Sequence, residues 1–300
     1  MLMLIDAASL WYRAYYGLPS SIKAPDGRRS GAVRGFFDGL AVLARRFSPT
    51  GMVCCLEGNW RPEWRLELLP AYKAERATAD GAEDTPDGLD DQVAAIEALL
   101  PALGIATATH PRYEADDVIA TLAARTAEPV LVVTGDRDLF QLVDDDRARH
   151  VVYLAKGISK AELFDGEAVA TKFGVSPGHY VDFAVLRGDP SDGLPGVKGI
   201  GAKTAVALVN TYGGISGIKA AAADEASELP ARQRAAITDA ADYLDRAVKV
   251  SSVVTDVDVP VVDAAIPETW KDPKAVEALA EEWNVGSALK RLREAVAAAE

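Results

Sequence analysis

Short apolar runs alternate with helical patterns along the first half of the chain. The runs over residues 1–5, 52–56 and 129–134 are apolar or β-branched, and segments with helical periodicity separate them. Strands that alternate with helices are typical of an α/β fold with a mostly parallel sheet. The pattern therefore predicts a mostly parallel sheet flanked by helices.

An acidic residue follows each of these three runs within two positions. These residues are Asp6, Glu57 and Asp136. Ligands of open α/β sheets bind beyond the carboxyl ends of the strands. We therefore expect three separate strands to deliver carboxylates to one edge of the sheet.

The segment between Glu57 and a helix predicted over residues 92–103 is too long for an ordinary α/β loop. An acidic stretch over residues 79–91 follows its aromatic residues and cations, which are Trp60, Arg61, Trp64, Arg65, Tyr72, Lys73 and Arg76. Such interleaving suits stacking on bases and pairing with phosphates. The alternative is a solvated helical excursion, because Glu57, Glu63, Glu67 and Glu75 offset the cations.

From about residue 167 the pattern is predominantly helical, over residues 168–173, 179–187, 204–212, 231–250 and 273–299. We predict an α/β core over residues 1–166 and a helical lobe over residues 167–300. The connection between them is not rich in proline or serine, which favours a lobe packed on the core.

Composition and charge qualify this picture. The 300 residues are 49% hydrophobic, as in a globular protein, and carry a formal net charge of -13. This acidity argues against nucleic-acid binding through overall electrostatic attraction. Cations bound by an acidic site would weaken the objection, because they reverse the local field.

The chain carries no sign of export or membrane insertion. Its two cysteines, Cys54 and Cys55, are adjacent, and there is neither a signal-peptide pattern nor a long apolar run. We expect a cytoplasmic protein without a membrane span. The absence of heptads and of a large apolar stripe favours a monomer.

Acidic residues gather in short, separate clusters: Asp6, Glu57, Glu114 with Asp116 and Asp117, Asp136 with Asp138, and Asp189 with Asp192. Carboxylates that a fold brings together repel one another, so a divalent cation is needed to neutralise them. Hard oxygen ligands indicate magnesium or manganese. Taken singly, the clusters could instead cap a helix or form turns.

The glycine-rich run over residues 196–204 is not a nucleotide-binding P-loop, because its lysine does not directly follow the final glycine and the run follows a helix. It fits a hairpin between two helices, where backbone N–H groups can approach a DNA phosphate and Lys198 and Lys203 add charge. The three histidines, His110, His150 and His179, have no metal-ligand spacing and are expected to be structural or exposed.

In their order and combination, six blocks of sequence resemble the bacterial and phage 5′ nucleases, or flap endonucleases. This family includes the 5′-nuclease domain of bacterial DNA polymerase I. The blocks are residues 4–6, 71–76, 113–117, 134–139, 187–192 and 194–204, and together they cover nearly the whole chain.

The resemblance implies a PIN-like sheet, a helical arch over about residues 58–90 and a helix-hairpin-helix element over about residues 186–212. It also implies a site with two or more Mg²⁺ or Mn²⁺ ions, held or oriented by Asp6, Glu57, Glu114, Asp116, Asp117, Asp136, Asp138, Asp189 and Asp192. Lys73 and Arg76 on the arch would grip the scissile phosphate. DNA contacts would come from Arg65, Tyr72, Gly196, Lys198, Gly199, Gly201, Lys203 and Thr204, with a potassium ion at the hairpin.

The implied activity is metal-dependent hydrolysis of DNA with 5′ flaps, gaps or 5′ ends in replication and repair. Two positions depart from the family pattern: Glu57 replaces the usual aspartate and Gly193 the usual asparagine. Neither change removes a carboxylate, so we expect activity to survive. The alternatives are a non-catalytic branched-DNA scaffold, which the intact carboxylate set disfavours, and an RNA-cleaving relative, which the glycine hairpin disfavours.

Overall fold

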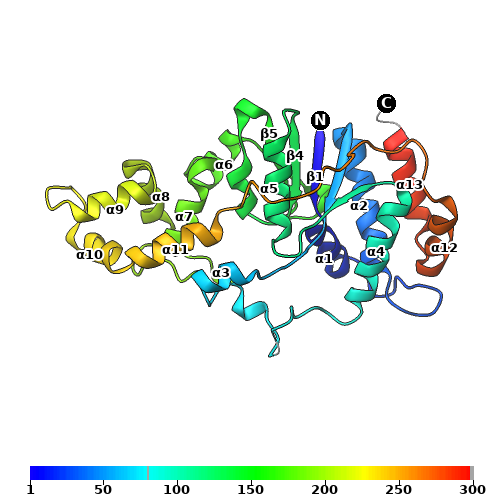
Figure 1. Ribbon diagram of the computed structural model, residues 1–300, viewed down its shortest axis with the longest axis horizontal. Helices are drawn as coiled ribbons and strands as arrows, with labels where there is room; N and C mark the ends of the chain where they lie inside the picture. Colours follow the sequence, from blue (N-terminus) through cyan, green and yellow to red (C-terminus); the bar gives the residue numbers. More distant parts are fainter. Residues whose placement is uncertain (80, 298–300) are drawn as a thin grey trace.

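A six-stranded sheet forms the centre of the molecule in the computed structural model, which describes residues 1–79 and 81–297 (Figure 1). The strand order is β3-β2-β1-β4-β5-β6, and the pairs are parallel except β5 with β6. The strands are β1 (Leu2–Asp6), β2 (Gly51–Cys55), β3 (Ala106–Ala108), β4 (Val130–Thr134), β5 (Arg149–Tyr153) and β6 (Glu162–Phe164). The predicted mostly parallel sheet is confirmed.

Strand β1 lies between β2 and β4, with Leu4 opposite Val53 on one side and Val132 on the other. Every residue of β2 and β4 is buried, as expected for strands covered on both faces. This register brings the carboxyl ends of all three strands to the same edge. The three acids that follow these strands therefore start from neighbouring positions.

Helices cover both faces of the sheet. Alternate side chains of β1 enter different cores, with Met3 and Ile5 in one and Leu4 in the other. The first core includes residues of α1 (Ala7–Gly17), α2 (Gly31–Phe47) and α4 (Leu89–Leu103). The second includes α5 (Ala115–Arg125) and continues into the helical lobe, so lobe and sheet share one apolar core.

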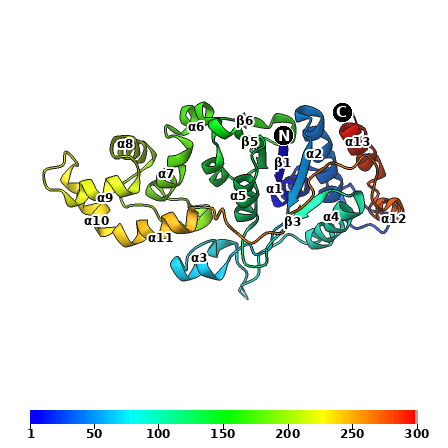
Figure 2. The ribbon, with the colours of Figure 1, turned by 45° about the horizontal axis from the view of Figure 1, so that its top comes forward.

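The helical lobe extends from the β6 side of the sheet in both views (Figures 1 and 2). Its helices are α6 (Gly166–Phe173), α7 (Tyr180–Arg187), α8 (Ala202–Tyr212), α9 (Ile215–Ala223), α10 (Ala231–Asp239) and α11 (Ala241–Ser251). The helix predicted over residues 231–250 is thus two helices, separated at Ala240.

The last two helices correct the predicted extent of the lobe. We expected one helix over residues 273–299 within the lobe, but α12 (Pro273–Trp283) and α13 (Gly286–Ala297) pack against α4 and α2 at the opposite end of the molecule (Figure 1). Burial of Val276, Trp283 and Leu292 in the first core explains this return. A left-handed Asn284 ends α12, and residues 298–299 lie outside the described part.

The predicted helical arch is largely non-helical. Between residues 58 and 88, the described chain has only the short helix α3 (Glu63–Leu68) and the 3₁₀ turn η1 (Ala74–Arg76). Prolines and glycines punctuate the segment and prevent a longer helix. We call residues 58–79 and 81–88 the arch segment. No helix in the described chain is long and apolar enough to span a membrane.

Candidate active site

A cavity of about 270 Å³ opens at the carboxyl edge of the sheet. Five of the predicted ligands line it, namely Asp6, Glu57, Glu114, Asp116 and Asp136. The basic residues Lys73 and Arg76 of the arch segment lie at the same cavity, as do Tyr12, Trp60 and Glu83. The structure therefore brings together carboxylates from separate strands and cations from the arch segment, as the sequence predicts.

Strand ends and helix starts fix these carboxylates. Asp6 ends β1 and caps α1, and its side chain accepts hydrogen bonds from the Ser9 backbone N–H at 3.1 Å and from Thr134 Oγ1 at 2.8 Å. The Asp136 backbone N–H donates to the same Thr134 hydroxyl at 2.8 Å. Thr134 thus couples the positions of two acids from neighbouring strands.

Burial and nearby negative charges raise the pKa values of three cavity acids, Asp6, Glu57 and Asp116. Burial is the larger cause for Asp116, whose pKa lies well above its usual value, followed by the charges of Asp136 and Asp6. Burial also raises the pKa of Asp6, with a further contribution from Asp136. The pKa of Glu57 rises to about 8 through burial and the nearby Glu114. Buried like charges of this kind are stabilised by a bound cation.

Asp136 is also close to a second group of acids. Burial, then Asp136 and Asp192, raise the pKa of Asp138 well above its usual value. The pKa of Asp192 is raised by burial and by Asp136, against the lowering effect of Lys73 and Arg76. Asp138 and Asp192 therefore extend the acidic site toward the lobe.

Asp189 lies beside these acids, and its carboxylate is held by hydrogen bonds from three neighbouring side chains. Oδ1 accepts from the Ser191 hydroxyl at 2.5 Å, and Oδ2 accepts from Arg187 at 3.0 Å and from Arg137 at 3.4 Å. In this structure Asp189 shapes the turn that carries Asp192. Its predicted role as a metal ligand remains a prediction.

The donor set fits a hard divalent cation. Carboxylate oxygens are the ligands that magnesium and manganese prefer, and Asp6, Glu57, Glu114, Asp116 and Asp136 supply them around one cavity. Across residues 1–79 and 81–297, no group of three or more acidic, histidine or cysteine side chains is already gathered into a finished metal site.

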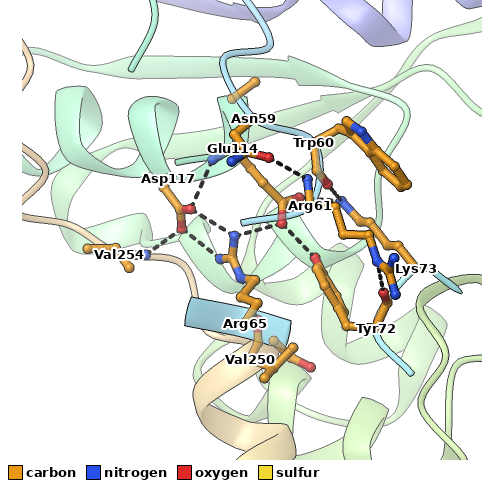
Figure 3. Close-up of polar contacts among 12 residues, drawn as sticks. Asn59, Trp60, Arg61, Arg65, Tyr72, Lys73, Glu114, Asp117, Val250 and Val254 are labelled. Atoms are coloured by element: carbon orange, nitrogen blue, oxygen red, sulfur yellow. Dashed lines mark hydrogen bonds and ion pairs between the residues drawn. The ribbon is translucent and has the colours of Figure 1, made fainter. Parts of the chain in front are cut away.

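Three predicted residues have a different role from the expected one (Figure 3). Arg65 is only 3% exposed and its guanidinium donates two 2.8 Å hydrogen bonds to Asp117, so it is not accessible to DNA. Tyr72 is also buried, with its hydroxyl donating to Glu114 at 2.9 Å. Asp117 is fully buried with Arg65 as its counter-ion, so it does not face the cavity as a ligand.

Lys73 and Arg76 both pair with acids of the site. Lys73 is buried, and its ammonium forms an ion pair with Oε2 of Glu114. The Arg76 guanidinium pairs with Asp192 at 3.0 Å, and its side chain is 40% exposed. Of the two cations, Arg76 is thus the one accessible to a phosphate at the cavity.

The predicted hairpin connects α7 to α8, as expected. Val197 and Ile200 anchor it in the core, whereas Lys198, Gly199, Gly201 and Lys203 are exposed. Gly196 and Gly199 have positive φ, which glycine adopts without strain. Thr204, half-buried, lies in the first turn of α8.

Two of the cavity residues that the sequence did not single out are Tyr12 and Glu83, whereas Trp60 belongs to the aromatic and basic segment named above. Tyr12 is on α1, and its hydroxyl bonds Glu83 from the arch segment. The position of Tyr12 six residues after Asp6 was an available signal, because it places the ring within two helical turns of the strand end. Nothing in the sequence pairs Glu83 with Tyr12.

Comparison with known proteins places this architecture in a family. Residues 1–174 match the 5′-3′ exonuclease N-terminal resolvase-like domain, and residues 175–274 match the 5′-3′ exonuclease C-terminal SAM fold. The second match ends where α12 begins, in agreement with the return of α12 and α13 to the core.

The chain is 49% identical to a 5′-3′ exonuclease of Streptomyces coelicolor over 97% of this chain and 98% of that protein. It is 44% identical to DNA polymerase I of Mycobacterium bovis over 71% of this chain, but over only 23% of the polymerase. The fold matches a flap endonuclease of bacteriophage T5, solved with DNA and metal ions, with a TM-score of 0.64, 18% identity and coverage of 99% of this chain and 98% of that one. The protein is therefore a nuclease that belongs to the 5′-3′ exonuclease family.

Proposed function

We propose that this protein is a metal-dependent, structure-selective 5′ nuclease that hydrolyses DNA at 5′ flaps, gaps and 5′ ends during replication and repair. The convergence of five carboxylates from separate strands and helices on one cavity, with Arg76 at its margin, carries the proposal. The T5 flap endonuclease that shares this fold was solved with DNA and metal ions. Its structure supports the proposal that this protein also binds DNA and divalent metal ions.

The site residues suit an in-line displacement at phosphorus. Asp6, Glu57, Glu114, Asp116 and Asp136 would hold Mg²⁺ or Mn²⁺, with Asp138 and Asp192 on the lobe side. When bound, such ions would neutralise the charge on the phosphoryl oxygens and lower the pKa of a water molecule. Arg76 is exposed enough to pair with a phosphate oxygen, while Lys73 holds the Glu114 carboxylate in place.

Other surfaces fit the nucleic acid around the cut. The rings of Tyr12 and Trp60 line the cavity and offer flat faces to a base beside the scissile phosphate. The hairpin amides, together with Lys198 and Lys203, suit the backbone of a duplex and carry no base information. We further propose a potassium ion at the hairpin, a monomeric state and a cytoplasmic location.

Cleavage of 5′-labelled flap, gapped-duplex and single-stranded DNA in magnesium, manganese and EDTA tests the proposal. Metal-dependent cuts near the junction of the flap would support it. Absence of cleavage by folded protein in both metals, with duplex binding retained, would instead favour a branched-DNA scaffold. Matched RNA substrates separate the DNA nuclease from an RNA-cleaving relative.

A further inference from the structure

We propose that Arg65 is a positioning residue of the nuclease site, acting through Glu114, and that Asp117 serves as its counter-ion. The inference rests on the proposed function, because it assigns Glu114 to the catalytic cavity. It concerns a residue that lies outside the cavity and that the alternating aromatic and basic pattern assigns to DNA contact instead.

The guanidinium of Arg65 joins three segments that are distant in sequence. It starts on α3 at the base of the arch segment, with Nη1 2.8 Å from Glu114 Oε1 and Nη2 2.8 Å from Asp117 Oδ1 at the start of α5. Its Nε donates to the carbonyl oxygen of Val250 in α11 at 2.9 Å. Figure 3 shows the side chain extended between these partners.

Asp117 completes the same cluster. Its Oδ1 accepts a hydrogen bond of 2.9 Å from the backbone N–H of Val254, just after α11. Its Oδ2 accepts from the Glu114 backbone N–H at 3.3 Å and closes the N-terminal capping box of α5. Both oxygens are therefore used to fix the start of α5 and the end of α11, which leaves neither directed at the cavity.

The cluster determines where the Glu114 carboxylate points. Oε1 accepts from Arg65 and from the Tyr72 hydroxyl, while Oε2 pairs with Lys73. Glu114 is only 2% exposed, so these donors and the cavity make up most of its surroundings. Partners that hydrogen-bond a metal-ligating carboxylate tune its orientation, and their loss commonly weakens metal binding or activity.

Arginine is required at this position by geometry as well as by charge. The planar guanidinium bonds the side chains of Asp117 and Glu114 and the carbonyl oxygen of Val250 at the same time. A lysine ammonium cannot reproduce this forked geometry. The Arg65→Lys variant keeps the charge while losing the fork. It therefore separates positioning from simple charge compensation.

The test compares Arg65→Lys, Asp117→Asn and a matched control in the full chain. Arg125→Lys is the control, because Arg125 also uses its guanidinium to bind backbone carbonyls after α11, those of Val257 and Val259, but at the far end of α5. Manganese binding is measured by calorimetry on metal-free protein without DNA, and flap cleavage is measured as kcat and KM at several manganese concentrations.

We expect Arg65→Lys to weaken manganese binding and to lower kcat, each by about 10-fold or more. The KM for the flap should change less than about 3-fold, since Arg65 does not touch DNA, and Arg125→Lys should match the wild type. If Arg65→Lys lowers only the thermal midpoint, with manganese affinity and kcat unchanged, Arg65 is merely structural and the proposal is overturned.

Two further outcomes keep this inference separate from the proposed function. Should Arg65→Lys fail to fold, Asp117→Asn, which keeps the shape of the carboxylate, must show the same loss of manganese affinity and kcat for the proposal to stand. If the wild type fails to cut any substrate, the proposed function fails, while calorimetry still reports whether Arg65 positions the Glu114 carboxylate for manganese.

Discussion

Arg76 donates a hydrogen bond of 3.0 Å from Nη2 to Oδ1 of Asp192, which joins the arch segment to the loop after α7. The Asp192 side chain is only 8% exposed, whereas the Arg76 side chain is 40% exposed. A buried acid thus holds a basic side chain that remains accessible at the cavity. This pairing orients the guanidinium before any phosphate arrives.

The first prediction concerns the accessible guanidinium. Arg76→Gln should lower kcat on a flap substrate by about 100-fold, the scale of a lost donor to transition-state charge. The thermal midpoint should fall only slightly, because the Arg76 side chain is 40% exposed and a glutamine amide can still donate a hydrogen bond to Asp192. Arg293→Gln, at an exposed arginine on α13, is the control. Equal rates for the two variants would exclude a role for Arg76 in catalysis.

The second prediction concerns Asp138, one of the two acids on the lobe side of the site. Asp138→Asn should abolish cleavage and leave duplex binding measurable, because the hairpin surface is untouched. Asp146→Asn, at an exposed acid on the 3₁₀ turn η3 (Asp145–Arg147), should behave as wild type. Single-turnover cleavage and fluorescence anisotropy give the two readouts, and preserved turnover in Asp138→Asn would undermine the site.

The third prediction follows from the pKa of Glu57, which burial and Glu114 raise to about 8 from 4.5. In EDTA the folded protein keeps this proton between pH 4.5 and 8 while the unfolded chain releases it, so the free energy of unfolding should fall as pH rises through that window. One such proton corresponds to about 1.4 kcal/mol per pH unit. Glu57→Gln should remove this part of the slope in urea unfolding at pH 5, 6.5 and 8.

The same pKa predicts how manganese binding depends on pH. Because the ion binds the deprotonated carboxylate, its affinity should rise up to about pH 8 and then level off. Calorimetry in buffers of different ionisation enthalpy should detect proton release at pH 7. An unchanged pH profile in Glu57→Gln would show that other cavity acids control this dependence.

The fourth prediction explains Gly193, where the family usually has asparagine. Gly193 has φ of +72°, and a Cβ atom there would lie 2.0 Å from the carbonyl oxygen of Ala71 in the arch segment. Gly193→Asn should therefore push the arch segment away from Asp192, reducing kcat and the free energy of unfolding, the latter by about 1–3 kcal/mol. Gly178→Ala, with open space around its Cβ, is the control. No change in either property would mean that the arch segment adapts without cost.

The sequence was sufficient to predict the sheet and the convergence of its acids, because strand ends leave a local signal. Asp6, Glu57 and Asp136 follow apolar runs within two positions, and parallel register then brings them to one edge. Glycine and lysine spacing likewise located the hairpin between α7 and α8.

Partners formed by tertiary packing could not be predicted in the same way. Arg65 and Tyr72 have the composition of a DNA-binding segment, yet both are buried against Glu114. Asp117 has the same sequence setting as Asp116, but only one of them faces the cavity. The positions of α12 and α13 could not be predicted either, because their apolar faces could have packed into either of the two cores.

The return of α12 and α13 makes the helical lobe an insertion within the core. The chain enters the lobe through α6 and leaves it after α11, and the backbone N–H of Met52 then donates to the carbonyl oxygen of Ala264 at 2.8 Å. A single proteolytic nick between α11 and α12 would leave the lobe tethered through α6, while Trp283 and Leu292 kept the C-terminal fragment seated on α2 and α4. The nicked protein should thus survive as a two-fragment complex, because separating the fragments requires disruption of the first apolar core.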